Sequence, residues 1–195
     1  MDLSSERSVA HGGSAPAAEE LHAESCRNAR WYACRTRGRA EKQVESRLMG
    51  AGFDAYLPVV RRERQWADRK KLVEFPLFPG YVFARFELSQ VHDILATPGV
   101  ATLVRLNGNL TPIRDEELRS VRRMLEGASE TGLVPTAVDY LEPGDEVAVI
   151  DGPFRGMRGT LREVRGASRV VVRLSAIRQA VAVELNRKLL RRITA

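Results

Sequence analysis

The sequence lacks the features that would indicate a membrane protein or a secreted one. Its 195 residues contain no run of about 18 or more apolar side chains, so no segment is expected to span a bilayer. The start of the chain has no apolar stretch behind a positive segment, which a secretory signal would need. The two cysteines, Cys26 and Cys34, have no matching second pair, which predicts reduced thiols in the cytoplasm.

Residues that carry catalysis are also scarce. There are three histidines, and two of them, His11 and His22, lie in the first 28 residues. No group of side chains has metal-ligand spacing, and no nucleophile has an identifiable base. The acidic residues mostly neighbour basic ones, which is typical of surface pairs. The sequence therefore predicts a protein that is not an enzyme and that needs no cofactor or metal.

Positive charge is unevenly distributed along the chain. The formal net charge is +6. Residues 61–71 contain six basic side chains against two acidic ones, and eleven basic side chains against two acidic ones follow from Arg155 onward. Two separate basic regions favour a polyanionic partner, most simply nucleic acid. The alternative is a solvated surface that aids solubility.

Hydrophobic periodicity divides the chain into parts. Residues 1–28 have no periodic apolar pattern and are expected to be a disordered tail. Ala40, Val44 and Leu48 recur every four residues, so they share one face of a helix. Tyr81 and Phe83 are expected to share one face of a strand. Expected strands are Trp31–Cys34, Phe53–Leu57, Tyr81–Phe86 and Val100–Leu106, and expected helices are Ala40–Met49, Gln90–Ala96 and Asp115–Glu126, the last ending at Gly127.

The second part of the chain has a different texture. Residues 128–140 lose periodicity and gather Ser, Thr, Gly and Pro, which predicts a linker. Short strand patterns separated by turn residues follow, which predicts a small β-barrel over residues 141–195. The basic segment 61–74 reads as a long hairpin or a mobile loop. The fold class is therefore α+β, with a small antiparallel sheet flanked by helices and then a small SH3-like barrel. The expected barrel strands are Glu146–Ile150, Gly159–Val164, Arg169–Leu174 and Val181–Leu185.

Two segments resemble a known family. The first is Pro76–Phe83, which follows Trp31-Tyr32 and an amphipathic helix; the second is Pro143–Val147, followed by Asp151–Gly159. At these residues the chain resembles the NusG family of transcription elongation factors, and the second segment resembles that family's KOW motif. The resemblance extends in the correct order over about residues 30–195.

The resemblance implies an organisation and a function. It implies a NusG N-terminal domain at 29–127 and a KOW domain at 141–195. Trp31-Tyr32, Pro76–Pro79 and Tyr81 look closer to the specialised RfaH-like branch than to the housekeeping member. A monomeric factor that binds RNA polymerase and suppresses pausing or termination, on a limited set of operons, is thus expected. The alternative is a KOW-domain RNA-binding or ribosome-associated protein.

The resemblance also assigns expected contact residues. Aromatic and apolar side chains would dock on the clamp region of the largest polymerase subunits if their face is exposed. His92 falls near a second polymerase contact, although the Thr run that accompanies it in the family is replaced by Asp93-Ile94. The expected polymerase-binding residues are Trp31, Leu77, Phe78, Tyr81, Phe83 and His92.

A basic rim would lie near non-template DNA or nascent RNA, where arginine and lysine can pair with phosphates and a ring can stack on a base. Its expected residues are Arg35, Arg37, Arg39, Arg61, Arg62, Arg64, Trp66, Arg69, Lys70 and Lys71. In the KOW domain, Phe154, Ile177 and Arg178 would meet a small-subunit ribosomal protein or the terminator Rho. Ile177 stands where the family has an aromatic side chain, which leaves that contact open.

Overall fold

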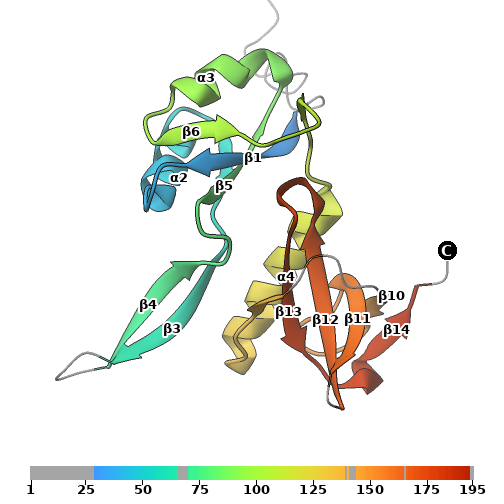
Figure 1. The fold of residues 1–195 in the computed structure, drawn as a ribbon. Helices are drawn as coiled ribbons and strands as arrows, with labels where there is room; N and C mark the ends of the chain where they lie inside the picture. Colours follow the sequence, from blue (N-terminus) through green and yellow to red (C-terminus); the bar gives the residue numbers. More distant parts are fainter. Residues whose placement is uncertain (1–28, 66–69, 139, 141–143, 165, 194–195) are drawn as a thin grey trace, which may run out of the picture.

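The computed structural model describes residues 29–65, 70–138, 140, 144–164 and 166–193 (Figure 1). Its N-terminal elements are β1 (Arg30–Thr36), α2 (Glu41–Gly50), β2 (Asp54–Tyr56), β3 (Val59–Gln65), β4 (Lys70–Pro76), β5 (Tyr81–Phe86), η1 (Leu88–Gln90), α3 (Val91–Ala96), β6 (Val100–Leu103), β7 (Arg105–Leu106) and β8 (Asn109–Leu110). The later elements are α4 (Asp115–Thr131), β9 (Thr136–Val138), β10 (Asp145–Val149), β11 (Arg158–Val164), β12 (Ala167–Leu174), η2 (Ser175–Ile177), β13 (Gln179–Glu184), η3 (Arg187–Leu189) and β14 (Leu190–Arg192). The mixture of separate sheets and helices is that of an α+β protein.

The N-terminal sheet has four antiparallel strands in the order β2-β5-β1-β6. Because side chains alternate across a strand, its two faces carry different residues. One face packs against α2 and α3, where Val44, Leu48 and Ile94 are fully buried. Tyr32, Cys34, Val82, Ala84 and Phe86 belong to this face. Burial raises the pKa of the Cys34 thiol to about 12, so this thiol is neutral at physiological pH.

The opposite face of the same sheet carries Trp31, Ala33 and Phe83, and Ala33 pairs directly with Phe83. The predicted alternation along β5 is confirmed, since Phe83 joins one cluster and its neighbours Val82 and Ala84 join the other. Among the described residues of the N-terminal half, no helix covers this face. Its cover comes from α4 and from the sheet that follows.

The C-terminal sheet has six antiparallel strands in the order β14-β10-β11-β12-β13-β9. Gly152 and Gly156 adopt positive φ angles in the β10–β11 connection, as the predicted turns require. Glycine is required at position 159 for a different reason: a Cβ there would lie 2.5 Å from the carbonyl oxygen of Val171. α4 lies between this sheet and the N-terminal sheet (Figure 1).

One expectation about the middle of the chain was wrong, and a second segment holds a strand that was not predicted. The helix predicted to end at Gly127 continues to Thr131 and ends at Gly132, whose φ is +72°. Gly127 is retained inside the helix because the ring of Phe154 packs directly against it. The predicted linker also contains β9, which pairs with β13. Strand β9 escaped sequence reasoning because its three residues are too few to show a period.

The basic segment 61–74 forms the β3–β4 hairpin, which projects away from the N-terminal sheet (Figure 1). The predicted domain boundaries themselves remain predictions. None of the helices in the described part of the chain combines the length and apolar composition that crossing a bilayer requires.

Replacing Gly127 with alanine should destabilise the protein. A Cβ at this position would meet three ring atoms of Phe154 at 2.6–2.8 Å, and Phe154 is buried. Overpacking of this kind costs roughly 1–3 kcal/mol, which outweighs the gain of about 1 kcal/mol in helix propensity. Urea unfolding of the Gly127→Ala variant measures the loss.

Gly50→Ala is the matched control, because Gly50 is the last residue of α2 and a Cβ added there would meet no heavy atom within 4 Å. It should leave the free energy of unfolding unchanged or raise it slightly. Equal stability of the two variants would show that Gly127 does not serve the contact with Phe154.

Candidate functional site

A hydrogen-bonded turn between Phe78 and Tyr81 positions the aromatic residues of the segment Pro76–Phe83. The amide of Tyr81 donates to the carbonyl of Phe78 at 3.2 Å, and Gly80 between them has a φ of +83°, which favours glycine. The amide of Gly80 donates to Glu41 Oε1 at 2.8 Å, and its carbonyl accepts from the amide of Thr36 at 2.9 Å. The turn is therefore anchored to β1 and to the start of α2.

The side chains around this turn form what we call the ring surface, defined as Trp31, Leu77, Phe78, Tyr81 and Phe83. Phe78 and Phe83 meet edge to face, with ring centroids 5.9 Å apart. Phe83 is 0% exposed, Phe78 1%, Leu77 8% and Trp31 9%, whereas Tyr81 is half-buried. The structure brings these predicted residues together, but it does not leave their face open.

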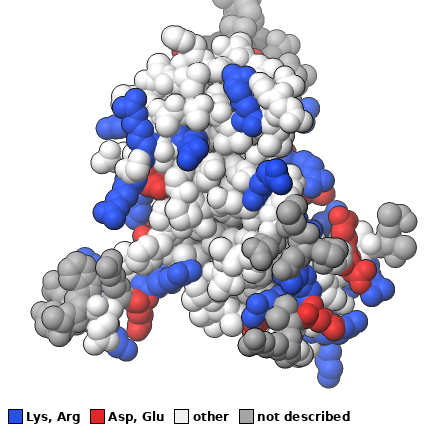
Figure 2. Space-filling model, viewed as in Figure 1, with Lys and Arg blue, Asp and Glu red and all other residues white. Residues whose placement is uncertain are grey.

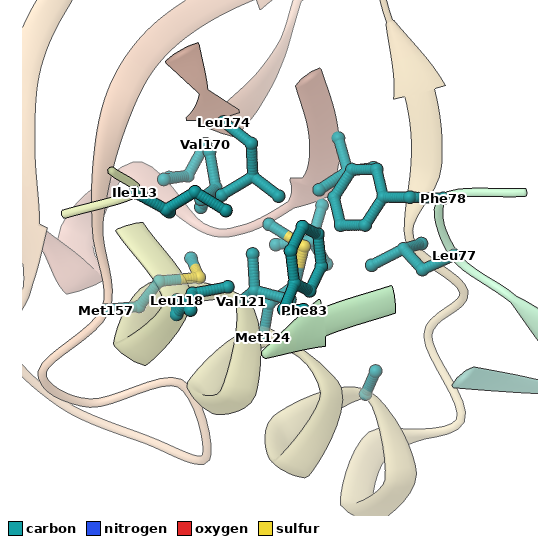
Figure 3. Close-up of a cluster of buried hydrophobic side chains, with 14 of the residues drawn as sticks. Leu77, Phe78, Phe83, Ile113, Leu118, Val121, Met124, Met157, Val170 and Leu174 are labelled. Carbon is teal, nitrogen blue, oxygen red and sulfur yellow. The ribbon is translucent and has the colours of Figure 1, made fainter. Parts of the chain in front are cut away.

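The cover of the ring surface is supplied by the second half of the chain. Figure 3 shows Phe78 and Phe83 in one cluster with Met124 of α4 and with Val170 and Leu174 of β12. The short helix η2 contacts β1. Within the described residues, the ring surface and the inner side of the C-terminal sheet thus share a single apolar core.

Polar contacts fix α4 to the C-terminal sheet. Buried Glu117 accepts from Ser175 Oγ at 2.8 Å and from the Ser175 amide at 3.4 Å, and it pairs with Arg114 at 2.8 Å. That hydrogen bond raises the pKa of Arg114. One turn further on, Ser120 Oγ accepts from the amide of Arg158 at 3.1 Å. These contacts join specific atoms, so they select one seating of α4 on the sheet.

Arg122 borders the ring surface on its outer side. Its guanidinium lies 4.7 Å from the ring centroid of Tyr56 and 5.4 Å from that of Trp31. Burial raises the pKa of Tyr56 to about 12, and the charge of Arg122 partly opposes this shift. Tyr56 and Arg122 were not identified from the sequence. Their positions on β2 and α4 become neighbours only through tertiary packing.

His92 lies apart from the ring surface, exposed on α3. Leu88 and Leu95 are 62% and 42% exposed. Leu95 follows His92 by three residues on the same face of α3, and Leu88 begins the 3-10 helix η1 that leads into α3. Sequence reasoning missed these two leucines, although the spacing was visible in the sequence. The three side chains define a small apolar patch around His92.

The basic residues of the β3–β4 hairpin divide between its two faces. Arg61 pairs with Glu74 at 3.3 Å, and Lys70 pairs with Glu63 at 3.5 Å. Hydrogen bonds from Lys42 and Arg61 lower the pKa of Glu74, which is therefore charged at neutral pH.

The register places Arg62 opposite Val73, so Arg62 and Lys71 share the other face of the hairpin. Both are exposed, and neither makes an ion pair within the described residues. Arg64 lies opposite Lys71 in the register, whereas Trp66 and Arg69 fall outside the described residues.

The end of β1 and the loop that leads to α2 supply a second group of exposed cations. Arg35, Arg37 and Arg39 are all exposed, and Arg39 has a φ of +57°. Lys42 in the first turn of α2 pairs with Glu74 of β4 at 3.0 Å, which ties the base of the hairpin to this end of α2. In the face drawn in Figure 2, basic side chains of the upper, N-terminal part have few acidic ones among them.

The C-terminal sheet differs in its charge. Arg158, Arg169, Arg187 and Arg192 pair with Glu116, Glu184, Glu163 and Asp145. Acidic side chains also lie among the basic ones over this part in Figure 2. The basic excess counted from the sequence is therefore partly neutralised, which weakens the argument that this sheet binds a polyanion.

The predicted partner-binding residues of this sheet are mostly covered. Phe154 and Ile177 are buried, Phe154 against α4, while Arg178 is exposed with a φ of +52°. Among the described residues, no group of three or more His, Cys, Asp or Glu side chains is arranged to hold a metal ion.

Comparison with known proteins gives these features a context. Residues 29–122 match the family model described as NusG, transcription termination factor nusG. The transcription termination/antitermination protein NusG of Thermus thermophilus is 28% identical over 164 residues, covering 73% of this chain and 88% of the relative. The protein of that name from Pseudomonas aeruginosa is 28% identical over 169 residues, covering 80% and 94%.

A solved structure, "Domain interaction in Thermotoga maritima NusG", is 25% identical, covers 87% of this chain and 99% of that chain, and gives a TM-score of 0.46. The family match covers residues 29–122, and this part of the chain is therefore similar to a NusG domain. Membership of the RfaH-like branch remains a prediction.

Replacing Glu117 with alanine should loosen the seating of α4. Ser175 and Arg114 would both lose their acceptor, and removing a buried hydrogen-bonding partner costs roughly 1–3 kcal/mol. The free energy of unfolding in urea measures this loss.

Glu116→Ala is the control, since Glu116 lies in the same helical turn but makes only an exposed pair with Arg158. Its effect should stay within about 0.5 kcal/mol. An equal effect of the two substitutions would contradict a specific role for Glu117.

Proposed function

We propose that the protein is a non-enzymatic, cytoplasmic transcription elongation or antitermination factor that docks on RNA polymerase through the ring surface. The observation that carries the proposal is the ring surface itself, which lies around an anchored turn in the part of the chain that is similar to a NusG domain. Clustered rings at a protein surface are typical of binding hot spots. In the NusG family, the matching surface is expected to meet the polymerase clamp.

Docking requires that the cover move. Four of the five ring-surface residues are buried by α4 and the C-terminal sheet, so the closed arrangement leaves mainly Tyr81 accessible. Polymerase would then bind an open form that is in equilibrium with the closed one. The smaller the fraction of molecules that are open, the weaker is the apparent affinity for polymerase.

The same opening would release the second predicted site. Phe154 packs on Gly127 of α4, and Ile177 belongs to η2, which contacts β1. Both residues face the shared core, so they become available only when the C-terminal sheet leaves. We infer that the sheet acts as a KOW domain that recruits a ribosomal protein or Rho after polymerase has been engaged. One tether would then raise the effective concentration of the second partner.

The patch around His92 supports a second polymerase contact. Leu95 is exposed on α3, which packs on the Cys34 face and so lies on the side of the N-terminal sheet opposite to the ring surface; Leu88 is exposed in η1, directly before α3. Two contacts on opposite sides of one domain can bridge two parts of a partner. Such bridging would stabilise one conformation of polymerase without any covalent step.

Tyr81→Ala should weaken binding to RNA polymerase by about tenfold or more, since interface tyrosines are frequent hot spots. Tyr81 is half-buried, so the fold should tolerate the change. Glu117→Ala should strengthen binding, because it destabilises the cover without touching the ring surface. Binding of full-length protein to purified, nucleic-acid-free core polymerase measures both effects.

Asn109→Ala, an exposed change on β8, should leave the affinity unaltered. Unaltered binding by Tyr81→Ala would reject the ring surface as the docking site. Retention of ribosomal RNA without polymerase would favour the alternative of an RNA-binding or ribosome-associated protein.

We also infer that the hairpin face with Arg62 and Lys71 contacts non-template DNA or nascent RNA. The Arg62→Ala/Lys71→Ala pair should lower the slope of log affinity against log salt by about 0.7 for each lost phosphate contact with a single strand. Fluorescence anisotropy with a single-stranded oligonucleotide measures the slope.

Arg61→Ala/Lys70→Ala is the matched control, because it removes the same charge from cations that already pair with Glu74 and Glu63. Its effect on the slope should be smaller. Equal slopes for the wild type and for Arg62→Ala/Lys71→Ala would exclude this face as the contact.

A further inference from the structure

A separate concavity lies at the far end of the ring-bearing face. It has a volume of about 710 Å³ and lies between the end of α2, strand β2 and the first two turns of α4. Trp31 borders it, and the pairing of Trp31 with Arg85 sets it apart from Tyr81, which pairs with Arg35 at the other end of β1. Its size is that of a small-molecule site.

Charges of both signs line this cavity without pairing to each other. The basic residues are Arg85, Arg119 and Arg122, and the acidic ones are Asp54 and Asp115. None of the five makes an ion pair with any described residue. Other charged side chains of α4 do pair: Glu116 with Arg158, Glu117 with Arg114, and Arg123 with Glu126. The cavity therefore holds unused capacity for charge-assisted hydrogen bonds.

Two of the three guanidinium groups are held in place by their surroundings. Arg85 Nε donates to the carbonyl of Ala29 at 3.3 Å, and Arg122 lies over the rings of Tyr56 and Trp31. Arg119 is exposed and precedes Arg122 by three residues on α4, so the two side chains lie on the same side of the helix. Cations fixed before binding lose less entropy when a ligand arrives, which favours affinity.

The geometry points to a nucleoside phosphate as the ligand of this cavity, either free or as one unstacked unit of a single strand. Guanidinium groups bind phosphate oxygens, while the carboxylates of Asp54 and Asp115 can accept from ribose hydroxyls or base amino groups. The partly buried ring of Phe53 offers apolar surface to a base, and the edge of the cavity beside it is formed by Trp31.

The composition of the lining separates this ligand from simpler ones. A purely acidic ligand would leave the two aspartates without hydrogen-bond donors, and a purely apolar ligand would leave all five charges without partners. A nucleotide carries an anion, hydrogen-bond donors and a flat ring in one molecule. None of these residues belongs to the basic hairpin or the β1–α2 loop, and the inference does not depend on polymerase binding.

Calorimetric titration of the full chain with AMP, GMP, CMP, UMP and inorganic phosphate tests the proposal. At least one mononucleotide should bind more tightly than phosphate, and Arg119→Ala should weaken that binding by about tenfold. Arg123→Ala removes the same charge from the same helix outside the cavity and should have no effect. If a mononucleotide binds more tightly than phosphate and only Arg119→Ala weakens this binding, the ligand of the cavity is a free nucleotide.

The second arm uses a single-stranded decanucleotide and the Arg62→Ala/Lys71→Ala background, which removes the proposed hairpin contact. Binding of the strand but not of mononucleotides, weakened by Arg119→Ala and not by Arg123→Ala, identifies an unstacked unit of a strand. The proposal is overturned if nothing binds, if phosphate binds as tightly as nucleotides, if Arg119→Ala changes nothing, or if only a peptide of alternating Glu and Arg binds.

Discussion

The position of α4 between two sheets is the constraint on which the rest of the structure depends. Its apolar side chains Val121 and Met124 belong to a core that contains both the ring surface and the inner side of the C-terminal sheet. Apolar packing supplies most of the attraction but little direction. Two specific contacts fix the orientation of α4 on the sheet: Glu117 accepts a hydrogen bond from Ser175, and Gly127 leaves room for the ring of Phe154. One helix thereby holds the two apolar surfaces against each other.

This arrangement reconciles burial with binding. The core of a folded domain and the docking surface of a binding protein have the same chemistry, and burial alone cannot separate them. What distinguishes the ring surface is the origin of its cover, because Val170 and Leu174 come from a sheet more than 80 residues further along the chain. The opposite face of the N-terminal sheet is instead covered by α2 and α3 of the same half. Only the first of these two faces can be opened without unfolding the N-terminal half.

Much of the local structure could be predicted from the sequence, whereas the contacts between the halves could not. Ala40, Val44 and Leu48 placed α2 correctly, and the alternation in β5 assigned Phe83 to its face, because both depend on short-range periodicity. The end of α4 was misplaced because glycine usually disfavours a helix interior, and only the ring of Phe154, 27 residues away, explains Gly127. The sequence suggested a basic C-terminal part, but the pairing of Arg169 with Glu184 depends on strand register. Arg85, Arg119 and Asp54 meet in one cavity only after folding.

Strand β9 sets the length of the connection between α4 and the rest of the C-terminal sheet. While β9 stays paired with β13, only residues 132–135 join it to the end of α4, and four extended residues span about 14 Å. If β9 detaches together with Tyr140, whose carbonyl accepts from Arg173 Nε at 3.1 Å, the connection extends to the start of β10 at Asp145, and thirteen residues span about 45 Å. A three-residue strand is a weak attachment, with its pairing confined to Ala180, Val181 and Ala182. The distance that the second half can move from α4 would thus be determined by one of the two shortest strands of its sheet.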